Sequence, residues 1–282
     1  MAAAKDETRP KSDRQILQEQ MDASLHEYRR NTSSLFMSAT AAGLEIGFSF
    51  FLMAVFYTLF SDELGKHQLH MLMAASYPIG FVMVIMGRAD LFTEHTTLAI
   101  LPVLDRRESV LALGRVWGVI YSGNLLGAMM FSLLLVQYEA VSPYIDPKAL
   151  SYYGEKSLMQ SGLGVFLGAV LAGWLMGLLG WVATSSTDTI GRIVLIILTT
   201  FVIGAGGLAH CIAGSVAMFS GWLGSPTAID TSEMLGYIAR ATVGNAVGGS
   251  VFVGMLKYGY ISSDKAPRST EEPKRWPRRP LK

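Results

Sequence analysis

Residues Gly162–Thr184 read GLGVFLGAVLAGWLMGLLGWVAT and contain no charged side chain. The hydrocarbon core of a bilayer is about 30 Å thick, and an α-helix needs roughly 20 apolar residues to cross it. This stretch therefore predicts a membrane-spanning helix. The whole chain fits the same class, because 51% of its 282 residues are hydrophobic and only 16% are charged, against about 25% charged in a typical soluble domain.

Further apolar blocks lie on both sides of this stretch. They are Ser34–Phe60, His70–Gly87, Leu111–Val136, Ile190–Ile203 and Gly236–Ile261. Two shorter apolar stretches, Thr97–Leu104 and Ile212–Leu223, complete the second and fifth blocks across polar, Gly-rich breaks. We therefore expect an all-α membrane protein in which residues 34–261 form six crossings, with the second and fifth helices broken.

Lys and Arg are unevenly distributed between alternate sides of these crossings. Eighteen of them precede the first block or follow the second, fourth and sixth blocks, whereas the opposite loops hold three, at Lys66, Lys148 and Lys156. Loops rich in Lys and Arg stay in the cytoplasm. The count predicts that both termini are cytoplasmic, which independently requires an even number of crossings.

The two ends of the chain differ from the apolar blocks. Within residues 1–33, apolar side chains recur at helical spacing between Lys11 and Asn31, which predicts either an amphipathic helix on the cytoplasmic membrane face or a solvated lead-in helix. Residues 262–282 are basic and rich in proline. We expect this tail to be disordered and to favour anionic lipid headgroups.

An internal repeat indicates how the crossings are organised. The motif Gly123-Asn124-Leu125-Leu126-Gly127 returns 121 residues later as Gly244-Asn245-Ala246-Val247-Gly248. The same offset aligns the break at Arg88–Thr96 with the break at Ala209–Ala217. Three crossings per half place the halves in opposite orientations, and such inverted repeats with interrupted helices recur in transport proteins.

The two breaks indicate a pore. An unpaired backbone group costs several kcal/mol in lipid, so irregular backbone persists only where protein or a watery cavity surrounds it. Half-helices that begin at the breaks would direct backbone N–H groups and positive dipole ends toward the middle of the membrane. This geometry predicts an anionic substrate.

The motifs at these breaks resemble those of the formate/nitrite transporters, and the resemblance extends over Ser34–Ile261. Arg88-Ala89-Asp90-Leu91-Phe92-Thr93 is similar to the family's Gly-Ala-Asp-Leu-Phe-Thr loop, and His210-Cys211-Ile212-Ala213-Gly214 to its His-Ser-Ile-Ala-Asn motif. Both Gly-Asn-x-x-Gly motifs are family features. The sequence Phe-Thr-Glu-x-Thr resembles most closely the divergent YfdC-like branch.

The resemblance implies an aquaporin-like protomer, assembled into a homopentamer in the bacterial inner membrane, with one pore in each protomer. It implies small monovalent anions or weak acids as substrates, such as formate, nitrite or hydrosulfide. By matching position, His210 is the central histidine that supplies or stabilises a proton, Thr93 is the loop threonine and Asn245 is the sixth-helix asparagine.

Each pore candidate also has a purely structural interpretation. Both ring nitrogens of His210 could be held by its own loop, and both asparagines could bond between helices, the interpretation we prefer for Asn124. Four apolar residues are candidates for dry constrictions that disfavour hydrated ions, although each could simply pack in the core. They are Phe81, Leu91, Phe92 and Ile203.

Charged residues set the chain apart from the common family pattern. Glu45 lies within the first crossing, where a carboxylate costs at least about 2.5 kcal/mol, so we expect it to have a partner or a proton-relay role. Arg88, Glu94 and His95 surround the first break, where an Arg88–Glu94 ion pair could hold the loop. Asp90 is a candidate backbone cap, and Gly214 replaces the family's asparagine.

An anion channel or proton-coupled weak-acid transporter is the leading hypothesis. A second hypothesis is a water or neutral-solute channel, but this sequence lacks the Asn-Pro-Ala pairs expected of one. A third is an assembly that moves protons or cations, or that transports nothing, and the acidic residues keep it open. No nucleophile–base pattern, metal-ligand pair or phosphate loop stands in a plausible setting. We therefore expect no enzymatic activity, no cofactor or metal, and no nucleic-acid partner.

Overall fold

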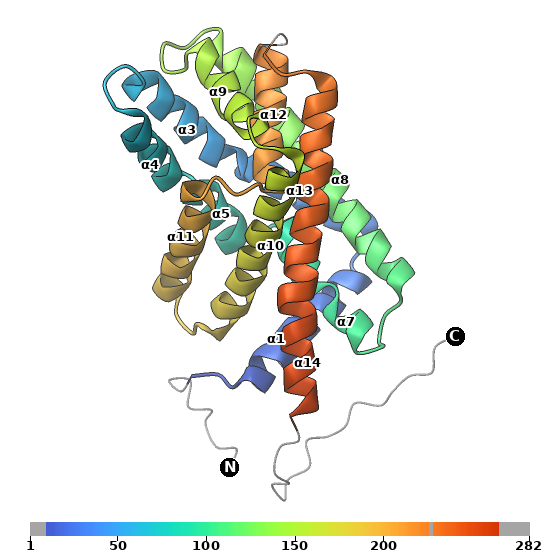
Figure 1. Cartoon of the computed structure of the whole chain (residues 1–282). Helices are drawn as coiled ribbons and strands as arrows, with labels where there is room; N and C mark the ends of the chain where they lie inside the picture. The colour runs from blue at the N-terminus through green and yellow to red at the C-terminus, as the bar shows by residue number, and fades with distance from the viewer. Residues whose placement is uncertain (1–9, 226–227, 265–282) are drawn as a thin grey trace, which may run out of the picture.

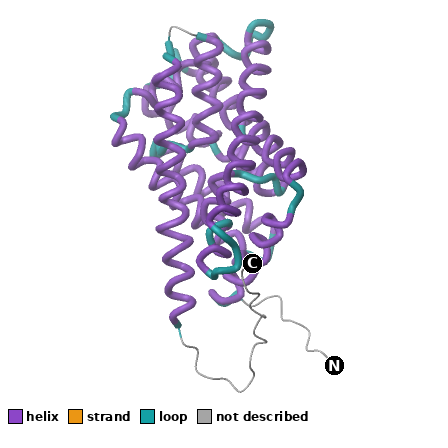
Figure 2. The backbone as a smooth tube through the Cα atoms, turned by 90° about the vertical axis from the view of Figure 1, so that its right-hand side faces the viewer, coloured by secondary structure: helices purple, strands orange, loops and turns teal. Residues whose placement is uncertain are grey.

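The computed structural model describes residues 10–225 and 228–264 as a helical bundle, with no strand among them (Figures 1 and 2). Its α-helices are α1 (Asp13–Arg29), α2 (Thr32–Glu45), α3 (Gly47–Phe60), α4 (Lys66–Ser76), α5 (Pro78–Gly87), α6 (Phe92–Leu98), α7 (Leu101–Leu104), α8 (Val110–Glu139), α9 (Pro147–Leu158), α10 (Gly162–Ser185), α11 (Thr189–Ala205), α12 (Cys211–Gly224), α13 (Thr231–Gly249) and α14 (Leu256–Ser263). A π-helical segment, η1 (Ser250–Met255), joins α13 to α14.

Four helical segments of the described chain are long and apolar enough to cross a membrane. They are Thr32–Phe60, formed by α2 and α3, Lys66–Gly87, formed by α4 and α5, and the single helices α8 and α10. The shorter apolar helices α11 and α12 follow one another across a break. The prediction of an all-α protein with apolar membrane-length helices is confirmed.

Both predicted interruptions are present, but the first is shorter than predicted and the second begins three residues earlier than predicted and ends at His210. The first covers Arg88–Leu91, because the helix resumes at Phe92, and the second covers Gly206–His210, because the helix resumes at Cys211. Each contains one residue in the left-handed region, with φ of 59° at Arg88 and at Gly207. Glycine adopts this conformation without steric cost, whereas an arginine there is uncommon.

Glycines let two pairs of long helices pack with their backbones in contact. A Cβ added to Gly43 of α2 would collide with the carbonyl oxygen of Asn124 in α8, and one added to Gly173 of α10 would collide with that of Asn245 in α13. Gly127 and Gly248 meet backbone atoms of α2 and α10 in the same way. The two Gly-Asn-x-x-Gly motifs are therefore packing seams.

Helix α1 lies across one end of the bundle, near α7 and α14 (Figure 1). Its Ile16 is buried in a cluster with Trp181 and Ile261, and Tyr28 donates a hydrogen bond to the carbonyl oxygen of Ala99 at 2.6 Å. The predicted helix is confirmed, and part of its apolar face packs on the protein itself. The basic tail lies almost entirely outside the described residues, which end at Asp264.

We expect Gly127→Val to destabilise the protein by about 3 kcal/mol, because a side chain there forces α8 away from α2. Thermal unfolding of the purified protein in detergent measures the loss. The matched control is Gly118→Val in the same helix, where an added Cβ meets nothing within 4 Å. Equal unfolding temperatures for the two variants would contradict the close packing described above.

Candidate functional site

His210 stands at the second break, immediately before α12, and only 1% of it is exposed. Its Nδ1 accepts hydrogen bonds from the backbone N–H groups of Ile212 and Ala213, both at 3.2 Å. Its Nε2 lies 2.9 Å from the hydroxyl oxygen of Thr93. One imidazole ring thus caps α12 and contacts the first turn of α6.

These contacts determine the tautomer of His210. Two N–H donors face Nδ1, so that nitrogen carries a lone pair, and the proton of the neutral ring must be on Nε2. Nε2–H then donates to Thr93. A second proton on Nδ1 would displace both capping bonds and place a positive charge at the positive end of α12, which disfavours the imidazolium form.

Thr93 is the second residue of α6 and is fully buried. Because its oxygen accepts the proton of His210, its own hydroxyl proton is free to donate, and no acceptor for it is recorded in the described part of the chain. The ring of Phe81 stands edge-on to that of His210, with centroids 5.1 Å apart. The structure therefore brings three predicted pore residues together, from α5, α6 and the second break.

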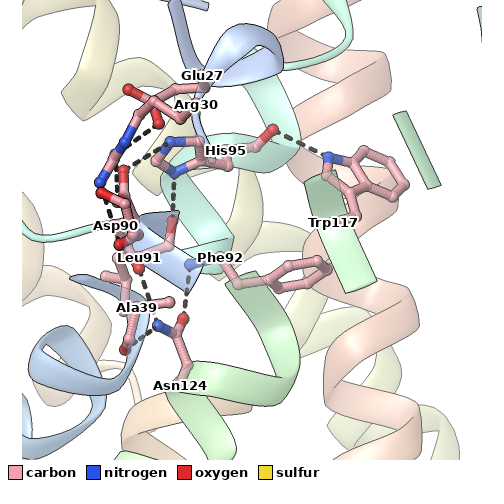
Figure 3. Close-up of polar contacts among 10 residues, drawn as sticks. Glu27, Arg30, Ala39, Asp90, Leu91, Phe92, His95, Trp117 and Asn124 are labelled. Atoms are coloured by element: carbon pink, nitrogen blue, oxygen red, sulfur yellow. Dashed lines mark hydrogen bonds and ion pairs between the residues drawn. The ribbon is translucent and has the colours of Figure 1, made fainter. Parts of the chain in front are cut away.

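The asparagine of each Gly-Asn-x-x-Gly motif holds one break in place. Asn124 accepts from the Phe92 N–H at 2.8 Å and donates to the carbonyl oxygens of Ala39 and Asp90 at 2.7 and 2.8 Å (Figure 3). Its amide therefore links α2, the first break and the start of α6.

Asn245 repeats this arrangement at the second break. It accepts from the Cys211 N–H at 2.8 Å and donates to the carbonyl oxygens of Ala169 and Ala209 at 2.7 and 3.0 Å. Its amide links α10, the break and the start of α12. In this geometry both of its N–H donors are used by backbone carbonyls.

The prediction that α12 would present bare N–H groups to an anion is wrong. The N–H of Cys211 bonds to Asn245, those of Ile212 and Ala213 bond to His210, and that of Gly214 bonds to the carbonyl oxygen of His210 at 2.8 Å. All four N-terminal donors are satisfied inside the protein. A side-chain donor is still available beside His210, in the hydroxyl of Thr93.

A charged network ties α1 to the first break (Figure 3). Arg30 contacts Glu27 at 2.6 Å and Asp90 at 2.7 Å, and Nε2 of His95 lies 3.4 Å from Asp90. Nδ1 of His95 donates to the carbonyl oxygen of Leu91 at 3.0 Å. Since both ring nitrogens face acceptors, the doubly protonated imidazolium is the favoured form of His95.

The same network contains a possible metal-ligand set. The nearest ligand atoms of Glu27, Asp90 and His95 all lie within 4.8 Å of one another. Arg30 already contacts both carboxylates, and its charge takes the place that a cation would need. The geometry is that of an ion-pair network, in which Asp90 binds side chains in addition to any capping role.

A family model for formate/nitrite transporters matches residues 14–259. The chain belongs to the formate/nitrite transporter family. It is therefore an integral membrane protein of a transporter family. Among its relatives, the inner membrane protein YfdC of Escherichia coli (strain K12) is 29% identical over 249 residues, which cover 87% of this chain and 78% of YfdC.

Two solved structures share the fold. One, an FNT family ion channel, superposes with a TM-score of 0.78 at 21% identity and covers 89% of this chain and 100% of its own. The other, a pentameric formate channel with formate bound, gives a TM-score of 0.69 at 21% identity and covers 82% of this chain and 98% of its own.

The four predicted constriction residues of this family member occupy two environments. Phe81, Leu91 and Ile203 are fully buried, and Phe81 lies directly against His210. The ring of Phe92 instead packs against Trp117 and Tyr121 of α8, with centroids 6.0 and 5.0 Å away.

The remaining charged candidates are dispersed. Arg88 is exposed, and within the described residues neither an Arg88–Glu94 nor an Arg88–Glu45 ion pair is recorded. One carboxylate oxygen of Glu45 is buried without a hydrogen-bond partner in the described chain, close to Gly87. Glu94 lines a cavity between α1, α6 and α10.

One contact near the second break was not predicted. Lys156 of α9 lies 3.0 Å from Nδ1 of His70, whose Nε2 bonds to the carbonyl oxygen of Ala205 at 2.9 Å. Burial lowers the pKa of Lys156, and the nearby Lys66 lowers it further. The sequence showed Lys156 only as a charge in a loop, and it did not indicate that this side chain lies beside His70 at the end of α11.

We expect Asn124→Leu to cost at least about 3 kcal/mol, because it removes three buried hydrogen bonds and leaves the Phe92 N–H without its acceptor. The measurement is the yield and thermal stability of the detergent-purified protein. Ser122→Ala is the control, since that exposed hydroxyl bonds only to carbonyls of its own helix. A fully stable Asn124→Leu protein would show that water or neighbouring groups can replace the amide.

Proposed function

We propose that this protein conducts small monovalent anions, such as formate or nitrite, through a pore in each protomer of a homopentamer, with passage assisted by protonation of the anion. The observation that carries the proposal is the Thr93–His210 hydrogen bond. It holds a hydroxyl donor in a fully buried place without any fixed charge.

The apolar surroundings explain why a neutral donor suits this substrate. A bare anion loses its hydration between the buried side chains of Phe81, Leu91 and Ile203, which is costly in a low dielectric. A hydrogen bond from Thr93 offsets part of that cost. A proton taken up from water removes most of it, because the weak acid then crosses as a neutral molecule.

His210 enters this mechanism as a neutral ring. Its Nδ1 is occupied by two backbone donors, so it has no ready place for a second proton. Its role is to orient Thr93, whose hydroxyl it turns into a donor toward the passing anion. The proton that assists passage comes from the solution in this scheme, in place of the proton donation by the histidine that the family resemblance implies.

A positive group supports anion entry at the opposite end of the bundle from α1. Lys156 and His70 lie beside the end of α11, close to the second break. An ammonium group there raises the local anion concentration. Because the pKa of Lys156 is lowered, this attraction weakens at a lower pH than it would for an ordinary lysine.

The paired asparagines support six crossings in two inverted repeats. Asn124 and Asn245 make the same three types of bond, each to a neighbouring helix, a break and the helix after that break. An arrangement of 1–33 as a cytoplasmic segment, 34–261 as the pore domain and 262–282 as a cytoplasmic tail follows from this topology and the Lys and Arg count. We place the pore in the bacterial inner membrane, because the relative YfdC is named as an inner membrane protein.

The likeness to a pentameric formate channel supports both the assembly and the choice of substrate. No enzymatic role is proposed, since the family is one of transporters.

We expect Thr93→Val to lower formate flux into proteoliposomes about tenfold, the cost of roughly one hydrogen bond. The variant keeps the shape of the side chain and removes the hydroxyl. Thr93→Ser, which restores the donor, is the matched control and should recover most of the flux. Native flux in Thr93→Val with an intact pentamer would show that Thr93 does not serve the anion.

We expect native formate flux to rise as pH falls, and His210→Asn to keep that slope at a lower overall rate. Asparagine is a good N-cap, so it can replace the bonds of Nδ1 to α12. The experiment is a pH series in proteoliposomes, with chloride as an anion that stays unprotonated. A flat pH response in His210→Asn would show that the imidazole carries the proton, and a chloride flux as large as that of formate would argue against proton-assisted passage.

A further inference from the structure

A small cavity lies between α1, α6 and α10, near the end of the bundle that α1 covers. Its volume is about 110 Å³, enough for a few water-sized groups. Oxygen-bearing side chains dominate its polar lining. These are Glu19, Gln20, Glu94, Thr97 and Thr184.

Glu94 follows Thr93 in α6 but points to this cavity, because successive helical residues are about 100° apart. No ion pair or hydrogen bond of its carboxylate is recorded within residues 10–225 and 228–264. A Cβ placed on Gly180 of α10 would lie 3.9 Å from Cγ of Glu94 and 3.8 Å from the amide nitrogen of Gln20. Both side chains therefore lie against Gly180.

Gln20 supplies an oxygen that has no partner. Only 4% of the residue is exposed, and its Nε2 donates to the hydroxyl oxygen of Thr184 at 3.3 Å. Thr184 donates its own proton to the carbonyl oxygen of Gly180 at 2.9 Å, so it cannot also donate to Gln20. Oε1 of Gln20 is left buried and unpaired among the described residues.

The charges around the cavity leave one negative charge uncompensated. Lys11 contacts Glu19 at 2.6 Å and also donates to the carbonyl oxygen of Thr184, so Glu19 is already neutralised. His95 and Arg30 are engaged with Asp90. Glu94 is the carboxylate that remains.

We propose that this cavity binds a monovalent alkali cation, Na⁺ or K⁺, through the carboxylate of Glu94 and Oε1 of Gln20. Hard cations prefer carboxylate and carbonyl oxygens, and both are present without partners. A single positive charge balances Glu94, whereas a divalent ion would leave an excess. The bound cation would join α6, which carries Thr93, to α1 and α10.

The test measures thermal unfolding of the full-length protein in detergent, in NaCl or KCl against N-methyl-D-glucamine chloride at equal ionic strength. We expect Na⁺ or K⁺ to raise the unfolding temperature by about 2–4 °C. Glu94→Gln and Gln20→Leu should lose this rise. Glu27→Gln is the matched control and should keep the rise, because it removes a carboxylate of α1 that contacts Arg30.

A second variant tests the cavity without changing its charge. Gly180→Ala adds a methyl group at ordinary contact distance from Gln20 and Glu94, so it should raise the cation concentration needed for half of the effect several-fold. Equal stability of the native protein in all three salts would mean that the cavity holds only water, and an undiminished rise in Glu94→Gln would place the cation elsewhere. Either result overturns the proposal, and neither depends on anion flux.

Discussion

The structure depends on pairing the backbone groups that two broken helices expose in an apolar environment. Each unpaired group costs several kcal/mol there. Asn124 and Asn245 meet part of this requirement, since each accepts from the first N–H of the helix after a break and donates to one carbonyl oxygen of that break and one of a neighbouring helix. Their amides reach the breaks because Gly43 and Gly173 let the helices approach backbone to backbone. The close packing of these helices and the hydrogen bonds of the two asparagines therefore depend on each other.

The chemistry at the centre follows from this pairing. Asn245 takes the N–H of Cys211, so the next two N–H groups of α12 are the ones that His210 caps. That capping leaves the proton of His210 on Nε2, where it meets Thr93. A chain of donors and acceptors that begins at a packing seam therefore ends with a hydroxyl that is free to donate.

Much of this arrangement could be predicted from the sequence, because apolar block lengths report bilayer crossings and the two breaks carry recognisable motifs. The meeting of Thr93 with His210 needed the family resemblance. The acceptors of the N-terminal N–H groups of α12 could not be predicted, since the periodicity of the sequence does not show which side chains accept from them. Asp90 was expected to cap backbone, but its partner Arg30 lies 60 positions away in the chain, and no local pattern links them.

Charge neutrality explains why acidic residues are tolerated beside an anion path. A unit negative charge about 8 Å from an anion costs roughly 2 kcal/mol at an effective dielectric constant of about 20, or about thirtyfold in occupancy. Around the first break, Glu27 and Asp90 are balanced by Arg30 and the imidazolium of His95. Glu94 adds an unpaired negative charge on the cavity side of α6 while it is ionised. A bound cation or a proton on Glu94 therefore serves the same end as the network on the other side of α6, which is to keep the surroundings of Thr93 free of net negative charge.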